Sequence, residues 1–426
     1  MFSKHRKPFG VLTALAAALT LAACGGGGGG RDEHGHGDHD HDEIHIETAG
    51  RLALAAPGDP GLRIVDLDDL AQRWSFTLDH APSQLYASPS GRYAVAVQRL
   101  QDQVQFVDGG VWQEDHVDHL HDYREAPRAS AFRLAGVRPT HYEAHGGQAA
   151  LFMDGLVDPQ ANAEVVLLSD DGIGESRSDA RLPLPINMHG TGEVRGTYLL
   201  TTWRDPDAAT TLPRQVELYR RDGQSYVFVE RFDAECPGLH GSFSSARHTV
   251  FGCSDGVLVV TQEHDQFVAT KLDNPSSLAE GVRIGSFVGS KRSDRIVGIA
   301  GQQQLFAIDA DAGKITSIDW TTDRLRRAQS FDRDGATLMV LDDLGMVHLL
   351  DAEQGWQRRA LLSAVGAMPQ SAPFPAITAS QARAEAYVTD PAGQRVVVID
   401  TADAVLASPI ALDFAPVSAV WLGIPR

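Results

Sequence analysis

Cysteine is scarce in this chain of 426 residues, which has only three, and positive charge is in deficit, with 37 Lys and Arg against 56 Asp and Glu. A formal net charge of −19 repels phosphate backbones and anionic lipid surfaces and attracts cations. We therefore expect no binding to nucleic acid. The sequence also lacks a P-loop, a dinucleotide-binding fingerprint and a Ser-His-Asp motif, so nothing in it indicates these chemistries.

The only long apolar run lies near the N-terminus, from Val11 to Ala23, and follows Lys4, Arg6 and Lys7. This run is too short to cross a bilayer and ends in small residues, which predicts a signal peptide over residues 1–23. Its removal would take the formal net charge from −19 to −22, since it carries three positive charges.

The signal peptide ends in Leu21-Ala22-Ala23-Cys24, which resembles a bacterial lipobox. We expect Cys24 to be lipidated and to anchor the protein to a membrane. By resemblance to lipoprotein sorting rules, Gly25 at the next position favours a periplasm-facing lipoprotein of the outer membrane. The alternative is a plain signal peptide that is cleaved nearby and leaves Cys24 free.

A tail over residues 24–47 combines flexibility with metal-binding side chains. Six glycines, Gly25 to Gly30, cannot hold a fixed backbone. Residues 31–45 then interleave histidines with aspartates and glycines, and both imidazole and carboxylate bind zinc. An expression tag would not sit behind a lipobox with so many acids. The histidines are His34, His36, His39, His41 and His45.

The two remaining cysteines, Cys236 and Cys253, would lie in an oxidising compartment if the protein is exported. A disulfide between them would close a short loop and contribute about 3 kcal/mol. The alternative is a pair of zinc thiolates, which no second CxxC-like pair supports.

Residues 48–426 consist of short runs with β-strand composition that are separated by Gly, Asp, Asn and Pro turns. Pairs of such runs recur every roughly 45 to 50 residues, which is the signature of a β-propeller. Repeat starts near residues 51, 92, 148, 197, 249, 295, 337 and 385 predict an all-β fold of eight blades. Seven blades remain possible if the first is irregular, and an array of β-sandwiches would not keep this spacing.

A second histidine cluster lies within the segment Trp112–Tyr123, after the strand that ends at Asp108 and the turn Gly109-Gly110. Three histidines within six residues rarely serve packing alone, so we expect a metal-binding loop on one rim of the propeller. A solvated polar loop is the alternative. These histidines are His116, His119 and His121.

A third set appears when the repeats are aligned. His141, His189 and His240 each lie nine residues before a position that we interpret as opening the innermost strand of a blade: Ala150, Tyr198 and Thr249. Equivalent positions are related by rotation about the propeller axis, so these side chains are expected to converge near the channel mouth. The alternative is that they cap strand ends by hydrogen bonds.

Three side chains plus a water or a mobile fourth ligand suit a site that must release its ion, and the loop from His116 to His121 is a candidate for the fourth ligand. Glu143, Glu193 and Asp122 are candidates for fixing the imidazole tautomers. The remaining single histidines are expected to be structural or exposed; these are His80, His248, His264 and His348.

Several segments together resemble the AztD-like family of periplasmic zinc metallochaperones. The loop Trp112-Gln-Glu-Asp-His-Val-Asp-His-Leu-His-Asp-Tyr123 is the most specific, because propellers in general lack it. The resemblance covers the chain from about residue 34 onward. The other segments that carry it are Ile44–Arg51, Tyr86–Val97, Met188-His-Gly190 and Glu235–Phe243.

The resemblance implies an eight-bladed periplasmic propeller that delivers zinc to the solute-binding protein of an ABC zinc importer, helped by a mobile histidine-rich N-terminal segment. Carried over to this chain, it points to the tail, loop and blade histidines named above. The lipobox is not expected in a chaperone that diffuses freely to its partner, so this chain differs from the family in this respect.

We therefore expect a monomeric, non-catalytic protein that binds and transfers Zn²⁺. One alternative is a membrane-anchored zinc buffer whose propeller serves as a docking platform. Another is a zinc-dependent hydrolase, for which Glu143 or Glu193 would be the general base.

Overall fold

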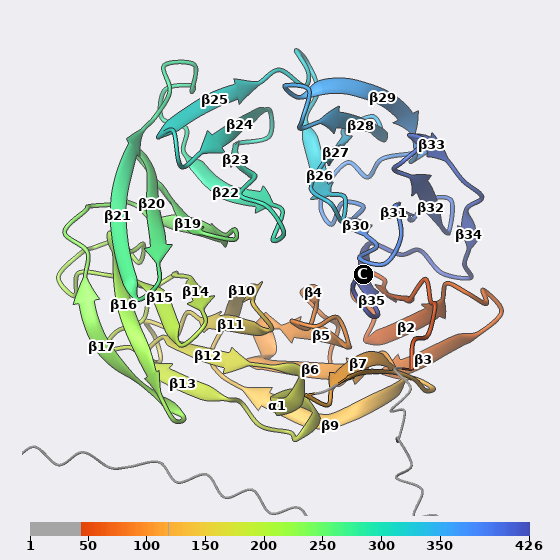
Figure 1. Cartoon of the computed structure of the whole chain (residues 1–426), viewed down its shortest axis with the longest axis horizontal. Helices are drawn as coiled ribbons and strands as arrows, with labels where there is room; N and C mark the ends of the chain where they lie inside the picture. Colours follow the sequence, from red (N-terminus) through yellow and green to blue (C-terminus); the bar gives the residue numbers. More distant parts are fainter. Residues whose placement is uncertain (1–43, 118) are drawn as a thin grey trace, which may run out of the picture. The chain divides into compact units, whose positions relative to one another are not determined.

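Eight antiparallel sheets surround a central axis in the computed structural model, which describes residues 44–117 and 119–426 (Figure 1). The predicted all-β, eight-bladed propeller is confirmed. The predictions for the signal peptide, for Cys24, for the glycine run and for the tail histidines His34, His36, His39 and His41 lie outside the described residues.

The strands of the first four blades, from the centre outwards, are β35 (Ser418–Leu422), β1 (Arg51–Ala55), β2 (Gly61–Asp66) and β3 (Arg73–Thr77); β4 (Gln84–Ala87), β5 (Tyr93–Gln98), β6 (Gln103–Asp108) and β9 (Arg128–Ala135); β10 (Pro139–His145), β11 (Gln148–Met153), β12 (Glu164–Leu168) and β13 (Ala180–Pro183); and β14 (Gly192–Arg195), β15 (Tyr198–Trp203), β16 (Gln215–Asp222) and β17 (Ser225–Arg231).

Those of the last four blades are β18 (His240–Ser244), β19 (His248–Cys253), β20 (Gly256–Glu263) and β21 (Gln266–Asp273); β22 (Ile284–Gly289), β23 (Ile296–Ala300), β24 (Gln304–Asp309) and β25 (Lys314–Ile318); β26 (Arg326–Phe331), β27 (Thr337–Asp342), β28 (Met346–Asp351) and β29 (Gln357–Ser363); and β30 (Ile377–Ala379), β31 (Glu385–Asp390), β32 (Arg395–Asp400) and β33 (Val405–Leu406), with the short β34 (Ile410–Ala411) also paired to β32.

The burial of each strand explains how strong its apolar pattern is in the sequence. Every residue of the second strands β5, β19 and β27 is buried, because neighbouring blades cover both faces. The outermost strand β21 alternates between exposed and partly buried positions along most of its length. The eight apolar clusters of the described chain each lie between two successive blades, so the core is a ring.

The ring closes within blade 1, where the C-terminal strand β35 pairs with β1 from Ser418 opposite Ala55 to Leu422 opposite Arg51. The Nε1 of Trp421 also donates a hydrogen bond of 2.8 Å to the carbonyl of Ala49. Both ends of the propeller sequence are therefore needed to complete one sheet.

Each repeat seen in the sequence starts at the second strand of a blade, whereas the sequence interpretation took it to start at the innermost strand. The strands that begin near residues 51, 93, 148 and 198 are the second strands of their blades, and not the innermost ones. The innermost strand precedes the second strand in blades 2 to 8 and is the C-terminal β35 in blade 1. Some innermost strands are short, such as β14 with four residues and β30 with three, so their pattern is weak.

One insertion departs from the regular blade. Between β6 and β9, a separate hairpin of β7 (Val111–Asp115) and β8 (Leu120–Arg124) projects from blade 2. Because β4 and β6 run in the same direction, this hairpin emerges at the face where the innermost strands end. We call this the exit face, and the opposite one, where the innermost strands begin, the entry face.

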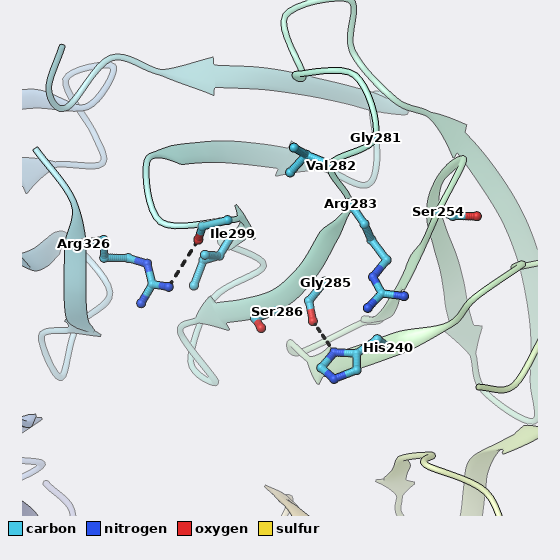
Figure 2. Close-up of a pocket in the computed structure, with 10 residues that line it drawn as sticks. His240, Ser254, Gly281, Val282, Arg283, Gly285, Ser286, Ile299 and Arg326 are labelled. Atoms are coloured by element: carbon cyan, nitrogen blue, oxygen red, sulfur yellow. Dashed lines mark hydrogen bonds between the residues drawn. The ribbon is translucent and has the colours of Figure 1, made fainter. Parts of the chain in front are cut away.

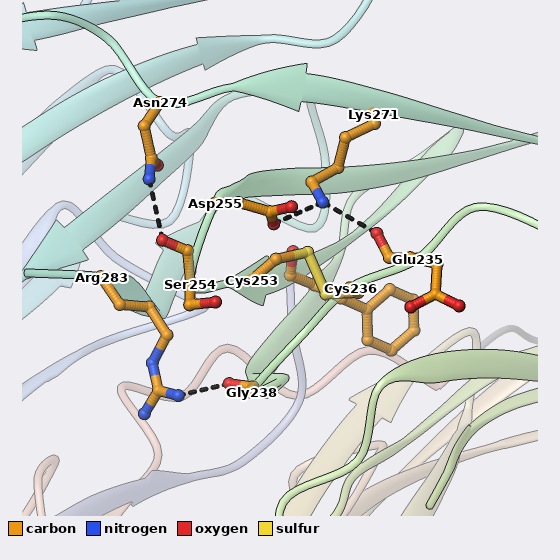
Figure 3. Close-up of a disulfide and its surroundings, with 10 residues drawn as sticks. Glu235, Cys236, Gly238, Cys253, Ser254, Asp255, Lys271, Asn274 and Arg283 are labelled. Atoms are coloured by element: carbon orange, nitrogen blue, oxygen red, sulfur yellow. Dashed lines mark hydrogen bonds and ion pairs between the residues drawn. A yellow bond between two sulfur atoms is a disulfide. The ribbon is translucent and has the colours of Figure 1, made fainter. Parts of the chain in front are cut away.

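Cys236 and Cys253 form the predicted disulfide, with both residues fully buried between blades 4 and 5 (Figure 3). It fastens the segment before β18 to the end of β19. The zinc-thiolate alternative for this pair is excluded by the bond.

We predict that the Cys236→Ala/Cys253→Ala variant lowers the free energy of unfolding by about 3 kcal/mol, because the bond spans 17 residues and its loss frees the unfolded chain. Urea denaturation of the metal-free protein measures this change as a lower midpoint. The wild type in reducing buffer is the control, and an unchanged midpoint in the variant would contradict the prediction.

A partly buried carboxylate joins blades 2 and 3. Asp170 is the first residue of the short helix α1 (Asp170–Gly174) and accepts a hydrogen bond of 2.9 Å from the Oγ of Ser88, with longer ones from the backbone N–H groups of Ser90 and Arg92. Burial raises the pKa of Asp170 to about 6, although these donors lower it.

Because the pKa of Asp170 is raised in the folded state, its protonated form contributes stability below the ordinary value of 3.8, and this contribution is lost as the pH rises through about 6. We predict that Asp170→Asn flattens the decline in stability between pH 4 and 6.5. Thermal unfolding across this range measures the effect, with the exposed neighbour in Asp171→Asn as the matched control. Parallel pH curves for Asp170→Asn and wild type would refute it.

No helix among the described residues is long and apolar enough to cross a membrane.

Candidate metal site

Three imidazoles meet at the entry face of the central channel. His141 lies in β10, His240 begins β18, and His189 lies in the loop before β14, so three successive blades contribute one each. One ring nitrogen from each lies within 4.8 Å of the others, and the ring centroids are 5.0 to 5.6 Å apart. This is the only such group of three metal-ligating side chains found in the described part of the chain.

Local irregularities of the backbone aim these side chains. The pairing register shifts between Pro139 and His141 in blade 3, and between His240 and Ser242 in blade 5. Such bulges redirect side chains at strand ends. His189 lies outside a strand, and its backbone N–H donates to the carbonyl of Thr211 at 3.0 Å, so a neighbouring loop holds it.

The nine-residue spacing that identified these histidines does not measure from structurally equivalent strand positions. Ala150, Tyr198 and Thr249, nine residues later in each case, are the third, first and second residues of their strands. All three lie in second strands, and the interpretation of these strands as innermost was wrong. The histidines converge because each lies near the start of an innermost strand: within β10, before β14 or at the first residue of β18.

Hydrogen bonds fix two of the three rings. The Nδ1 of His189 lies 2.9 Å from the Oδ2 of Asp154, and the Nδ1 of His240 lies 2.8 Å from the carbonyl oxygen of Gly285 (Figure 2). Because carboxylate and carbonyl oxygens only accept, both Nδ1 atoms donate, which leaves the Nε2 lone pairs for a ligand. This arrangement, with an outer partner fixing the tautomer, is typical of metal-binding histidines.

Burial disfavours the protonated form of two of the three rings. It lowers the pKa of His141 to about 4, and the neighbouring His189 and His240 lower it further. Burial also lowers the pKa of His240. A neutral imidazole need not lose a proton before it binds a cation, so the lowered pKa values of His141 and His240 favour metal binding by these two rings.

The carboxylates named from the sequence are not the partners of these rings. Asp122 lies at the exit face, where it accepts hydrogen bonds from the backbone of Ile46 and from Gln113. Glu143 and Glu193 make no hydrogen bond to the triad; burial raises the pKa of Glu193 to about 7 and that of Glu143 well above its usual range. Asp154, which the sequence did not single out, takes this role.

The loop histidines form a cluster of their own on the β7–β8 hairpin. The rings of His116, His119 and His121 lie 5.3 to 6.0 Å apart, and Ile44, where the described chain begins, bridges to His121. The hairpin emerges at the exit face, whereas the triad lies at the entry face. The suggestion that this loop supplies a fourth ligand to the triad was therefore wrong.

The single histidines have other surroundings. The buried rings of His248 and His348 contact Asp311 and Asp342, respectively, while His80 and His264 are exposed. The sequence did not single out His145. Its Nε2 lies 3.0 Å from the carbonyl oxygen of Ser245, two blades away, at the exit end of the channel. None of these belongs to the triad.

The fold and the triad together define an eight-bladed propeller with a tri-histidine site at one mouth of its channel. Comparison with known proteins gives a particular likeness. Over 379 residues the chain is 24% identical to the zinc chaperone AztD of Citrobacter koseri, which covers 88% of this chain and 87% of that protein. The resemblance that the sequence motifs indicated is thus confirmed.

Solved structures support the fold. The structure of apo AztD from Citrobacter koseri superposes with a TM-score of 0.74 at 22% identity, over 87% of this chain and 96% of that one. A second crystal structure of Citrobacter koseri AztD gives 0.75 at 22% identity, over 88% and 98%. The dihydro-heme d1 dehydrogenase NirN gives 0.57 at 14% identity, over 88% and 76%, so the propeller alone does not define a function. No family model matches the chain.

We predict that Asp154→Asn weakens zinc binding by the triad about 10- to 100-fold, because the Nδ1 of His189 loses its charged acceptor. Asp390→Asn is the matched control, since Asp390 also ends a second strand but bonds Arg395 in blade 8. Competition with a chelator of known affinity measures the change. An affinity unchanged in Asp154→Asn, or reduced equally in both variants, would show that Asp154 does not tune the site.

Proposed function

We propose that this protein binds Zn²⁺ on His141, His189 and His240 and passes it to the periplasmic zinc-binding solute-binding protein of an ABC importer, without catalysis. The single observation that carries the proposal is the convergence of three imidazoles, two of which have their tautomer fixed by a hydrogen bond. The likeness to the zinc chaperone AztD supports zinc as the metal.

The chemistry of the site suits transfer. Tetrahedral zinc with nitrogen ligands at about 2.0 to 2.1 Å needs nitrogens about 3.3 Å apart, so three rings within 4.8 Å need only a small contraction. Three protein ligands leave one position for water or for a ligand of the receiving protein. An incoming ligand can therefore bind before the first histidine leaves.

The hairpin histidines and the tail are proposed as a second zinc-binding region at the exit face. His116, His119 and His121 lie beside the point where the tail enters the described chain. The tail histidines His34, His36, His39 and His41 would capture zinc for this region. We further propose that the protein is exported as a monomer and is anchored through Cys24, facing the periplasm from the outer membrane.

Zinc titration against a competing chelator, using the mature chain, tests the proposal. We predict that His141→Ala/His189→Ala/His240→Ala loses about one tightly bound zinc, whereas the exposed histidines in His80→Ala/His264→Ala change nothing. A variant with alanine at His116, His119 and His121 is expected to keep that zinc and to lose binding elsewhere.

If the triad variant and the wild type bind zinc equally, the triad is not the tight zinc site. Loss of all tight binding only when the tail histidines are replaced would favour the membrane-anchored buffer. For transfer, the zinc-loaded protein is mixed with the solute-binding protein and the metal content of each is measured after separation. Zinc that appears in the partner no faster than its spontaneous release rate would argue against a chaperone.

A further inference from the structure

A cavity of about 570 Å³ opens beside the triad, over the entry ends of blades 5, 6 and 7. His240 forms part of its wall, and Arg283 and Arg326 approach it from different sides (Figure 2). Arg283 immediately precedes β22 and Arg326 begins β26, so two neighbouring blades each direct a guanidinium group toward this space.

Neither guanidinium has a carboxylate partner in the described chain. Arg283 donates to the carbonyl of Gly238, while the Nη1 of Arg326 donates to the Oε1 of Gln329 at 2.5 Å. The Nε of Arg326 is buried and has no hydrogen-bond partner. Burial lowers the pKa of both groups, and no acidic neighbour acts against it.

The wall of the cavity has no acidic side chain, although the chain has 56 Asp and Glu residues and a net charge of −19. Partly buried positive charge without a counter-charge costs free energy, and a bound anion would offset it. An anion that is repelled by the rest of the surface would be attracted here.

The positions of the two groups select the kind of anion. Guanidinium binds carboxylates through paired N–H donors, and two such groups on separate walls suit a molecule with more than one carboxylate. Carboxylate oxygen is also a zinc ligand, and His240 connects this cavity with the triad. A small polycarboxylate could contact both arginines while one of its oxygens reaches the metal.

We propose that this pocket binds a small polycarboxylate, about the size of citrate, and that one carboxylate occupies the fourth coordination position of zinc on the triad. The anion site is independent of the proposed function, whereas the contact with zinc rests on it. Zinc would then enter or leave the site as a complex with the polycarboxylate.

Calorimetric titration of the metal-free mature protein with citrate tests the anion site. The expected result is one saturable site that is at least tenfold weaker in Arg283→Gln and in Arg326→Gln. Arg327→Gln is the matched control, because Arg327 adjoins Arg326 but contacts Gln302 and the ring of Phe374 outside the pocket. Arg283→Lys keeps the charge if Arg283→Gln disturbs the loop at Gly238.

The absence of saturable binding, or equal weakening in Arg327→Gln, would overturn the site. Sulfate that competes as strongly as citrate would overturn the assignment to a polycarboxylate. Five acids of the tail, between residues 31 and 42, could also supply carboxylates: Asp32, Glu33, Asp38, Asp40 and Asp42. If replacing them with Asn and Gln tightened citrate binding, the tail and not a free molecule would be the occupant.

Cobalt(II) on the triad reports the contact with metal through its visible absorption bands. Citrate is expected to change these bands in the wild type and in Arg327→Gln while cobalt stays bound, but not in Arg326→Gln. Unchanged bands, or loss of cobalt to citrate, would overturn the coordination. If cobalt and zinc fail to bind even without citrate, the proposed function fails, and the calorimetric result still decides the anion site.

Discussion

Closure of the ring is the constraint on which the site depends. Each inner strand of a propeller must be covered on both faces, so the last blade must pack against the first, and here β35 completes the sheet of β1. Once eight blades close, the angle between successive innermost strands is set. His141, His189 and His240 then meet because the ring brings the starts of three successive innermost strands together.

Convergence alone does not make a metal site, since free imidazoles rotate and can present either nitrogen. Asp154 comes from the end of β11 and reaches His189 of the next blade, while the carbonyl of Gly285 reaches His240 from the blade beyond it. Arg99 of blade 2 in turn donates to Asp154 at 2.7 Å. Each tautomer is therefore fixed across a blade boundary, and the packing between blades determines the chemistry of the site.

The sequence predicted the number of blades because the second and third strands carry the strongest β pattern, and it predicted the triad because a short hairpin separates each histidine from such a strand. It could not show which strand of each blade is innermost, since an innermost strand such as β30 has only three residues. Nor could it identify Asp154: Asp342 and Asp390 also end second strands, but they bond within their own blades. That Arg283 and Arg326 have no carboxylate partner among the described residues likewise depends on which loops meet across blades.

The two histidine clusters lie on opposite faces, and charged side chains of both signs lie between them. Lys291 lies near Glu143 and Glu193, and Arg195 donates to the carbonyl of Ser245 and lies 3.3 Å from His145 at the exit end of the same three blades. Two cationic and two acidic side chains thus lie on the exit side of the triad. The loop around Thr211 and the basic pocket flank the triad at the entry face, whereas the hairpin histidines lie at the exit face, so the two clusters are separate sites with different surroundings.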